Sequence, residues 1–267
     1  MSGAAVDHRV VSVWDNKIRM QVQVRGSGPP LLYLHPAGGL QWDRFLGEMA
    51  RNYTIYAPLF PGTNPVDSFA IHQLDDIFDV VLAYEEALRA LDIVNAPVIG
   101  QSFGGMLAAE LASSFPNLFS QITLLDPAGL WNTANPWNLD FMWAPPEQLP
   151  KLLFSDPTNE GAVAMFAPPT SPEAGIDAAV AAIWTFGCVA KFLWPIPDRG
   201  LSRRLHRILK PTMIVWGAED QLIPVAYAHE FGRRIANSRV EILPNCGHIP
   251  QVEQMEKTLS LVRSFLA

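Results

Sequence analysis

A serine set between glycines is the clearest candidate nucleophile in this chain. Ser102 lies in the run Gly-Gln-Ser-Phe-Gly at 100–104, between a short apolar segment at 97–99 and a helical pattern at 103–114. Glycines two residues to either side let the backbone crowd into a tight turn from strand to helix, which lifts the hydroxyl above a sheet edge. A serine hydroxyl is a weak nucleophile, so catalysis there needs a base and an acid that orients it.

His248 is the candidate base and Asp220 the candidate acid. His248 follows a predicted strand at 239–243, whereas the other histidines lie near the N-terminus, before the serine or on helical stretches. Asp220 follows a predicted strand at 212–216, so the chain order is serine, acid, histidine.

Two other carboxylates compete for the acid role. Glu219 is adjacent to Asp220. Asp126 ends a predicted strand at 122–125 and would lie at the same edge of the sheet. The position of Asp220 between the serine and the histidine favours it, and both alternatives stay open.

A second small-residue loop, His-Pro-Ala-Gly-Gly at 35–39, follows a predicted strand at 31–34. Negative charge that develops on a carbonyl oxygen needs N–H donors held in place. We expect the backbone amides of Ala37 and Phe103 to be those donors, because the proline between His35 and Ala37 has no N–H. His35 and Gln101, beside these donors, are expected to contact the substrate.

The elements that must position these residues alternate between short apolar runs and helical patterns. Strands are predicted at 9–14, 18–24, 30–34, 53–57, 97–99, 122–125, 212–216 and 239–243. Helices are predicted at 41–50, 73–91, 103–114, 225–235 and 254–266. This alternation implies parallel crossovers, and hence an α/β fold with a doubly wound, mostly parallel sheet of eight strands.

Residues 127–210 interrupt that alternation with many prolines, few charges and five of the eight tryptophans. They form either an irregular buried insertion or a cap that shapes the substrate pocket, and both interpretations can hold together. The predicted domains are therefore a core of residues 1–126 and 211–267 and a cap of 127–210. Tryptophans of this cap are expected to line the pocket: Trp131, Trp143, Trp184 and Trp194.

One charge-free apolar stretch, 178–190, is too short to span a bilayer, which takes about 20 residues. It is interpreted as a buried helix. The N-terminal segment 1–16 carries charges and no continuous apolar region, so no secretory signal is predicted.

Composition excludes several other classes of function. The net charge of −7 argues against a nucleic-acid partner. Cys188 and Cys246 lie in no spacing typical of a metal site or a disulfide framework. We therefore expect a cytoplasmic protein without metal or cofactor, which acts on a small hydrophobic molecule and has no membrane partner. A homodimer stays open.

From Val10 to Leu266 the chain resembles the α/β-hydrolase superfamily. Segment 35–39 is similar to its oxyanion loop, with proline in place of the first glycine, and 100–104 matches its nucleophile turn. Segments 216–220 and 247–248 resemble its acid and histidine segments. The resemblance implies the α/β-hydrolase fold with a helical cap.

A narrower likeness joins the chain to carboxylesterases and to meta-cleavage-product carbon–carbon hydrolases. The latter usually have asparagine before the nucleophile, where this chain has Gln101, and a cap arginine for the substrate carboxylate. The nearest cap cations here are Lys191 and Arg199. A serine at the nucleophile position also argues against haloalkane dehalogenases.

The resemblance therefore favours a serine hydrolase that cleaves a carboxylic ester or related acyl bond of a hydrophobic substrate. The carbon–carbon hydrolase is the alternative. A slow-turnover ligand receptor of the same fold and a cofactor-independent perhydrolase also stay open, because a fold does not fix a function.

Overall fold

The computed structural model describes residues 5–64, 66–145 and 147–267. Residues 1–4 lie outside the described residues. They belong to the predicted core domain and to the segment 1–16, for which no secretory signal is predicted.

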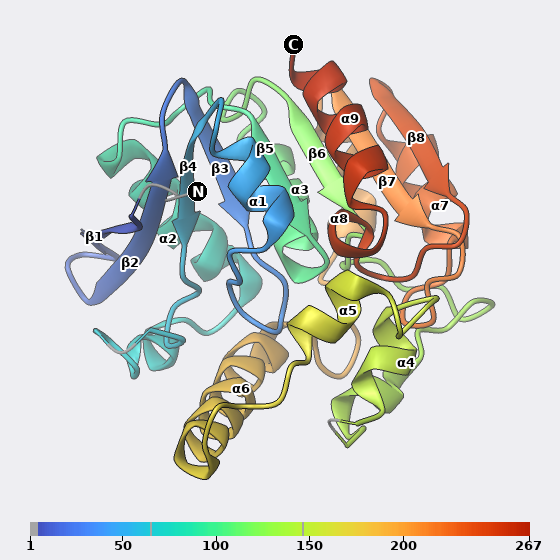
Figure 1. The fold of residues 1–267 in the computed structure, drawn as a ribbon. Coiled ribbons are helices and arrows are strands. Elements are labelled where there is room, and N and C mark those ends of the chain that lie inside the picture. The colour runs from blue at the N-terminus through green and yellow to red at the C-terminus, as the bar shows by residue number, and fades with distance from the viewer. Residues whose placement is uncertain (1–4, 65, 146) are drawn as a thin grey trace.

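Within this part of the chain, eight strands form one sheet (Figure 1). They are β1 (Asp7–Val13), β2 (Ile18–Gly26), β3 (Pro30–Leu34), β4 (Thr54–Pro58), β5 (Val98–Gln101), β6 (Ile122–Leu125), β7 (Thr212–Gly217) and β8 (Ser238–Leu243). Their order across the sheet is β1-β2-β4-β3-β5-β6-β7-β8. β1 and β2 pair antiparallel, β2 and β4 likewise, and every pair from β4 to β8 is parallel. The predicted α/β-hydrolase fold is confirmed.

The burial of the strands follows from their places in the sheet. β5, β6 and β7 are buried at every residue, as expected for central parallel strands covered on both faces. β2 alternates buried and more exposed positions, which is the pattern of a strand with one covered face. The continuous apolar runs in the sequence thus mark the middle of the sheet.

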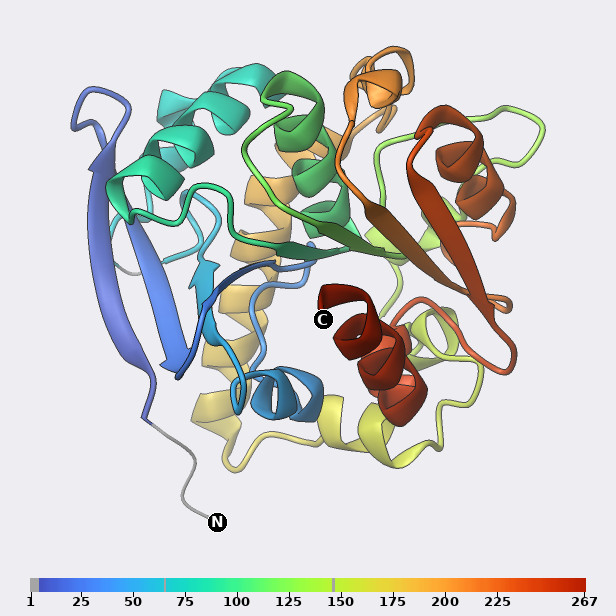
Figure 2. The ribbon, with the colours of Figure 1, turned by 90° about the horizontal axis from the view of Figure 1, so that it is seen from above.

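Helices cover both faces of the sheet (Figure 2). α1 (Arg44–Met49) and α9 (Met255–Leu266) lie on one face and contribute to one hydrophobic cluster. α2 (Ile77–Ala90), α3 (Phe103–Ser114) and α7 (Ala226–Arg234) lie on the other face and belong to a second cluster. The sheet is therefore doubly wound, as predicted.

The predicted helices exist, and capping residues shift two of their starts. α1 begins at Arg44, and not at 41, because the Asp43 side chain accepts the Leu46 amide at 2.8 Å. α2 begins at Ile77, and not at 73, because Asp76 accepts the amides one turn into the helix. The turns before α2 and α9 form separate short elements, η1 (Ala70–Gln73) and α8 (Pro250–Glu253).

The segment between β6 and β7 holds the remaining elements. These are η2 (Leu139–Met142), α4 (Leu149–Leu153), α5 (Glu160–Met165), α6 (Pro172–Leu193), η3 (Leu201–Arg203) and η4 (Leu205–Arg207). α4, α5 and α6 gather beyond the edge toward which β6 and β7 point (Figure 1). The division into a core domain and a cap stays a prediction.

The prediction that 178–190 forms a buried helix is wrong about its burial. The helix exists as α6, but Ile176, Val180 and Ile183 are 66%, 62% and 76% exposed. Only its last turns pack on the fold, through Cys188 and other buried residues, because its first turns extend beyond the body (Figure 1). An apolar sequence indicates a helix that avoids water but does not identify what covers it. α6 has 22 residues and contains an 18-residue window with a mean hydropathy of 1.6, so by length and composition alone it could span a membrane.

Candidate active site

Ser102 occupies a strained turn between β5 and α3. Its backbone angles are φ 53° and ψ −115°, a region that residues with side chains rarely adopt. The turn is held at both ends, since the Ser102 amide donates to the Leu125 carbonyl and its carbonyl accepts the Ala128 amide, each at 2.9 Å. A Cβ atom at Gly104 would lie 1.9 Å from the Leu34 carbonyl oxygen. Only glycine therefore lets α3 begin this close to the end of β3.

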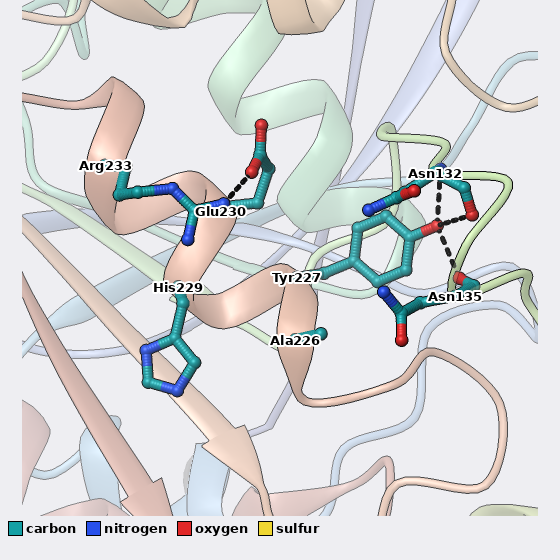
Figure 3. A pocket seen from close by; sticks show the side chains of 7 residues that line it. All are labelled: Asn132, Asn135, Ala226, Tyr227, His229, Glu230 and Arg233. Atoms are coloured by element: carbon teal, nitrogen blue, oxygen red, sulfur yellow. Dashed lines mark hydrogen bonds and ion pairs between the residues drawn. The ribbon is translucent and has the colours of Figure 1, made fainter.

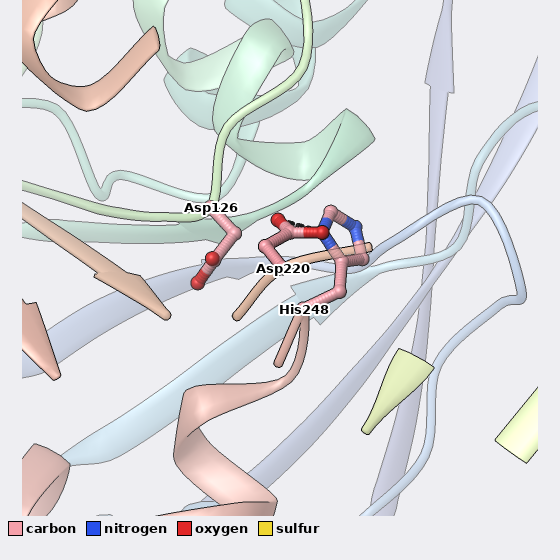
Figure 4. A group of neighbouring side chains, drawn as sticks. All are labelled: Asp126, Asp220 and His248. Carbon is pink, nitrogen blue, oxygen red and sulfur yellow. Dashed lines mark hydrogen bonds and ion pairs between the residues drawn. The ribbon is translucent and has the colours of Figure 1, made fainter. Parts of the chain in front are cut away.

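His248, in the loop after β8, lies against this serine. Its Nε2 atom is 2.9 Å from Ser102 Oγ. Its Nδ1 atom is 2.7 Å from Asp220 Oδ2, a contact that Figure 4 shows. His248 and Asp220 are both buried, whereas Ser102 is partly exposed. The structure thus brings together the three residues predicted as nucleophile, base and acid.

The hydrogen bonds of Asp220 determine which imidazole nitrogen carries the proton. Asp220 Oδ1 accepts the Leu222 amide at 2.8 Å and the Ile223 amide at 3.0 Å, which leaves Oδ2 for the histidine. A carboxylate can only accept, so Nδ1 of His248 donates to it and Nε2 accepts the Ser102 hydroxyl. This tautomer is the one that can remove a proton from the serine.

Asp126, the alternative acid, lies close to Asp220. Among the described residues, the structure records no hydrogen bond between Asp126 and His248. Asp126 is fully buried, and its Oδ1 atom accepts the Gly217 amide at 2.9 Å. Burial, together with the nearby charge of Asp220, raises the pKa of Asp126 well above its ordinary value. A neutral carboxyl is expected there, beside the charged one.

Asp126, Asp220 and His248 each offer a ligand atom within 4.8 Å of the others, a spacing that could also hold a metal ion (Figure 4). The hydrogen bond between His248 and Asp220 accounts for the proximity of these two residues, and the Gly217 amide holds Asp126 beside them. A metal at this point would compete with His248 for Asp220, and would leave the serine without an oriented base.

Glu219, the other alternative for the catalytic acid, makes hydrogen bonds to the backbone of Cys246. Its Oε2 atom accepts the Cys246 amide at 3.0 Å, and its own amide donates to the Cys246 carbonyl at 2.9 Å. Glu219 therefore joins the acid turn to the loop that carries His248.

The loop after β3 reaches the same edge as the serine. Nε2 of His35 accepts the Phe60 amide at 3.1 Å, so its Nδ1 donates to the Pro36 carbonyl at 2.8 Å. Burial lowers the pKa of His35, which agrees with this neutral form. Both ring nitrogens hold the loop in place, and substrate contact by His35 stays a prediction.

The predicted oxyanion donors lie on either side of a close backbone approach. The amide of Phe103 is the first of α3, where a helix has no earlier carbonyl for it. A Cβ at Gly104 would also meet the His35 carbonyl, at 2.7 Å, so the start of α3 abuts the loop that carries Ala37. The assignment of Ala37 and Phe103 as donors stays a prediction.

Gln101 lies beneath the site. It is fully buried, and its Nε2 donates to the His248 carbonyl at 3.0 Å. It thus connects the nucleophile turn directly to the histidine loop. Contact between Gln101 and a substrate stays a prediction.

Comparison with known proteins agrees with this arrangement. The sequence profile described as "Alpha/beta hydrolase family" matches residues 31–261, which is most of the chain. The chain belongs to the alpha/beta hydrolase family. Its eight-stranded sheet and its serine turn are features of that fold.

Similar proteins in the family include two kinds of hydrolase. The chain is 26% identical to monoacylglycerol lipase ABHD6 of Mus musculus, over 91% of this chain and 76% of that protein. It is 25% identical to 2-hydroxymuconate semialdehyde hydrolase of Pseudomonas sp. strain CF600, over 94% and 91%. Among solved structures, a bacterial membrane phospholipase A superposes with a TM-score of 0.79 at 24% identity, over 98% of this chain and 86% of that chain.

The four tryptophans predicted to line the pocket of this hydrolase lie in different settings. Trp131 is partly buried, whereas Trp143 and Trp194 are exposed. The Nε1 atom of Trp184 donates to the Gly62 carbonyl at 2.7 Å, which fixes the indole beside the loop after β4. Their contact with a substrate stays a prediction.

Glu253, which the sequence analysis missed, holds the histidine loop of this hydrolase to the inserted segment. One carboxylate oxygen accepts the amides of Gly247 at 2.6 Å and Ser155 at 3.2 Å, and the other accepts Asp156 at 2.6 Å. The His248 amide also donates to the Leu153 carbonyl at 2.8 Å. A glutamate five residues after the histidine is a weak signal, because two of the three amides it binds, those of Ser155 and Asp156, come from a distant segment.

We expect Glu253→Gln to weaken both stability and catalysis. The glutamine side chain keeps one oxygen as an acceptor, but its NH₂ group then faces backbone N–H donors. One or two charge-assisted hydrogen bonds, worth about 1.5–3 kcal/mol each, are therefore lost. The melting temperature should fall by several degrees and kcat by about tenfold, measured by calorimetry and ester hydrolysis. Glu256→Gln, at an exposed surface ion pair, is the matched control and should change neither. Equal behaviour of the two variants would contradict this role.

A surface pocket between the start of the inserted segment and α7 contains partly buried hydrogen bonds (Figure 3). The Tyr227 hydroxyl accepts the Asn132 amide at 2.7 Å and donates to the Asn135 carbonyl at 2.9 Å. Its lining comes from this loop and from α7, and not from the catalytic residues. Tyr227 therefore anchors the beginning of the insertion to the core.

Proposed function

We propose that this alpha/beta hydrolase cleaves carboxylic esters of small hydrophobic molecules through an acyl-enzyme. The observation that carries the proposal is the hydrogen-bonded chain from Ser102 Oγ through His248 to Asp220, at 2.9 Å and 2.7 Å. The strained turn at Ser102 supports it, since such strain persists where the surrounding structure enforces it, often at an active site.

In the acylation step, Ser102 Oγ attacks the ester carbonyl carbon while His248 Nε2 takes the hydroxyl proton. The carbonyl oxygen becomes an oxyanion, which the amides of Ala37 and Phe103 stabilise. The intermediate then collapses, the carbon–oxygen bond to the alcohol breaks, and His248 gives its proton to the leaving alkoxide.

In the deacylation step, water gives a proton to His248 and adds to the acyl carbon. The bond to Ser102 Oγ breaks and the serine regains the proton, which releases the carboxylic acid. Asp220 stabilises the imidazolium in both steps and keeps its Nδ1–H directed away from the serine.

The cap cations favour the ester over a ring-cleavage dienoate. Lys191 donates to the carbonyls of Ile71 and Leu74, and Arg199 donates to those of Phe192 and Trp194. Both cations therefore have partners other than a substrate carboxylate. The relatives named as lipases also support a hydrophobic ester, while the semialdehyde hydrolase keeps the carbon–carbon reaction as the alternative to test.

A substrate panel tests the proposal. Purified protein is assayed with aryl and glycerol esters of graded acyl length and with one ring-cleavage dienoate. We expect kcat/KM for the best ester to exceed that for the dienoate by at least about a hundredfold. The reverse preference would assign carbon–carbon cleavage, and binding of esters without turnover would assign a receptor. The absence of a cofactor and the cytoplasmic location stay predictions, and a homodimer stays open.

A further inference from the structure

The exposed half of α6 is unusual for a surface helix. Residues 178–184 are all exposed over nearly two helical turns, and they include Val180, Ile183 and Trp184. The window that meets the composition of a membrane span is only 22% buried. A helix that is apolar on all sides is normally covered by a core or by lipid, so water is not its expected surrounding.

Other exposed apolar side chains border this helix. The Phe69 ring contacts the Trp184 ring with 6.4 Å between centroids, and Phe69 is itself 68% exposed. Phe141 contacts Phe186 of α6 at 5.7 Å, which places the segment of the exposed Trp143 beside α6. We call this set the apolar cap surface: Phe69, Trp143, Ile176, Val180, Ile183 and Trp184.

The apolar cap surface adjoins the candidate active site. A Cβ at Gly39, in the predicted oxyanion loop, would lie 3.4 Å from the side chain of Thr185. Trp184 donates to the Gly62 carbonyl, and Cys188 would lie 3.0 Å from a Cβ at Gly62. α6 therefore passes directly over the loops beside Ser102, and its exposed half continues outward from them.

We propose that the apolar cap surface docks on an uncharged or zwitterionic lipid surface, from which the hydrolase takes its ester; this rests on the proposed function. One face of a protein partner covers one side of a helix, whereas lipid chains can surround residues 178–183, which precede the Trp184 contact with the fold, on every side. Tryptophan is also favoured where apolar and polar phases meet, and two of the six side chains are tryptophans. This departs from the expectation that the protein has no membrane partner.

Charge specifies the kind of lipid. No lysine or arginine occurs between residues 152 and 190, a range that holds four carboxylates: Asp156, Glu160, Glu173 and Asp177. The whole chain has a net charge of −7. Anionic headgroups would repel this surface, because binding to them relies on basic residues. Insertion would be partial, since the last turns of α6 are packed in the fold.

Flotation with phosphatidylcholine vesicles tests the docking. The protein is used as its Ser102→Ala variant, so that binding is measured without hydrolysis. We expect it to float with these vesicles and to bind less when phosphatidylserine is added. Adding Val180→Glu and Ile183→Glu should lower the bound fraction by about tenfold. Leu209→Glu, at a similarly exposed leucine before β7 and so at the opposite edge of the sheet, should keep binding.

Several outcomes would overturn the proposal. The first is that the Ser102→Ala protein does not float with the vesicles. The second is that Leu209→Glu lowers the bound fraction as much as the two α6 substitutions do. The third is that the protein does not bind vesicles but forms a dimer, which Ile183→Glu converts to a monomer. The neutral pair Val180→Ser and Ile183→Ser keeps the test decisive if the glutamates disturb folding. Hydrolysis of a soluble aryl ester by the otherwise wild-type Val180→Glu and Ile183→Glu variant should stay within about twofold. Failure of the wild type to cleave that ester would instead refute the proposed function, independently of flotation.

Discussion

Ser102→Ala is expected to lower kcat for ester hydrolysis by about 10⁴-fold or more, because the three catalytic groups act as a unit. The hydroxyl is the atom that forms the acyl bond, and His248 and Asp220 have no other nucleophile to activate. Steady-state hydrolysis of an aryl ester, with folded protein quantified by calorimetry, measures the effect.

The fold should persist in this variant. Ser102 makes no side-chain hydrogen bond to cap α3, and alanine brings the same Cβ into the same strained turn. A melting temperature within a few degrees of the wild type is the control. Hydrolysis that survives at more than a tenth of the original rate would remove Ser102 from the mechanism.

Asp220→Asn is expected to lower kcat by about 10³–10⁴-fold. The amides of Leu222 and Ile223 donate to Oδ1, so asparagine keeps its oxygen there and directs its NH₂ group at His248. The histidine then accepts at Nδ1 and carries its proton on Nε2, where it can no longer receive one from Ser102. Rates of aryl ester hydrolysis for variant and wild type give the comparison.

Asp126→Asn is the matched control, with an expected loss below tenfold. Its oxygen can still accept the Gly217 amide, and the buried carboxyl that it replaces is expected to be neutral. The opposite ranking of the two asparagine variants would make Asp126 the catalytic acid.

Asp126 also predicts a pH effect on stability. Burial raises the pKa of Asp126 in the folded state, so above about pH 4 the unfolded chain loses a proton that the folded chain keeps. This group's contribution to the free energy of unfolding is therefore complete at low pH and declines as pH rises. Asparagine has no such proton. Urea unfolding measures the free energy of unfolding of Asp126→Asn minus that of the wild type, and this difference should rise from pH 4 to 7. A difference that stays constant or falls would contradict the neutral carboxyl.

Most of the fold and the catalytic order could be predicted from the sequence, for a physical reason. Central strands of a parallel sheet must be apolar throughout, so β5, β6 and β7 appear as short continuous runs. The turn at Ser102 requires glycine where backbones approach within contact distance, which leaves a visible pattern. Constraints of this kind act between residues close together in the chain, so a short stretch of sequence is enough to predict them.

Features that depend on distant contacts could not be predicted in this way. The role of Glu253 depends on the Ser155 and Asp156 amides of the inserted segment, and that of His35 on the Phe60 amide after β4. The choice between Asp220 and Asp126 needed the distance to His248. The exposure of α6 was missed because an apolar helix has the same sequence whether protein, lipid or water surrounds it.

Labelling with a fluorophosphonate tests the central claim most directly, because the probe reacts with a serine only where a base activates it. Peptide mass spectrometry of the labelled protein should place a single adduct on Ser102, at a rate that Asp220→Asn lowers strongly. The Ser102→Ala variant should take up no label. An adduct on another residue, or ester hydrolysis that continues undiminished in fully labelled protein, would contradict the account.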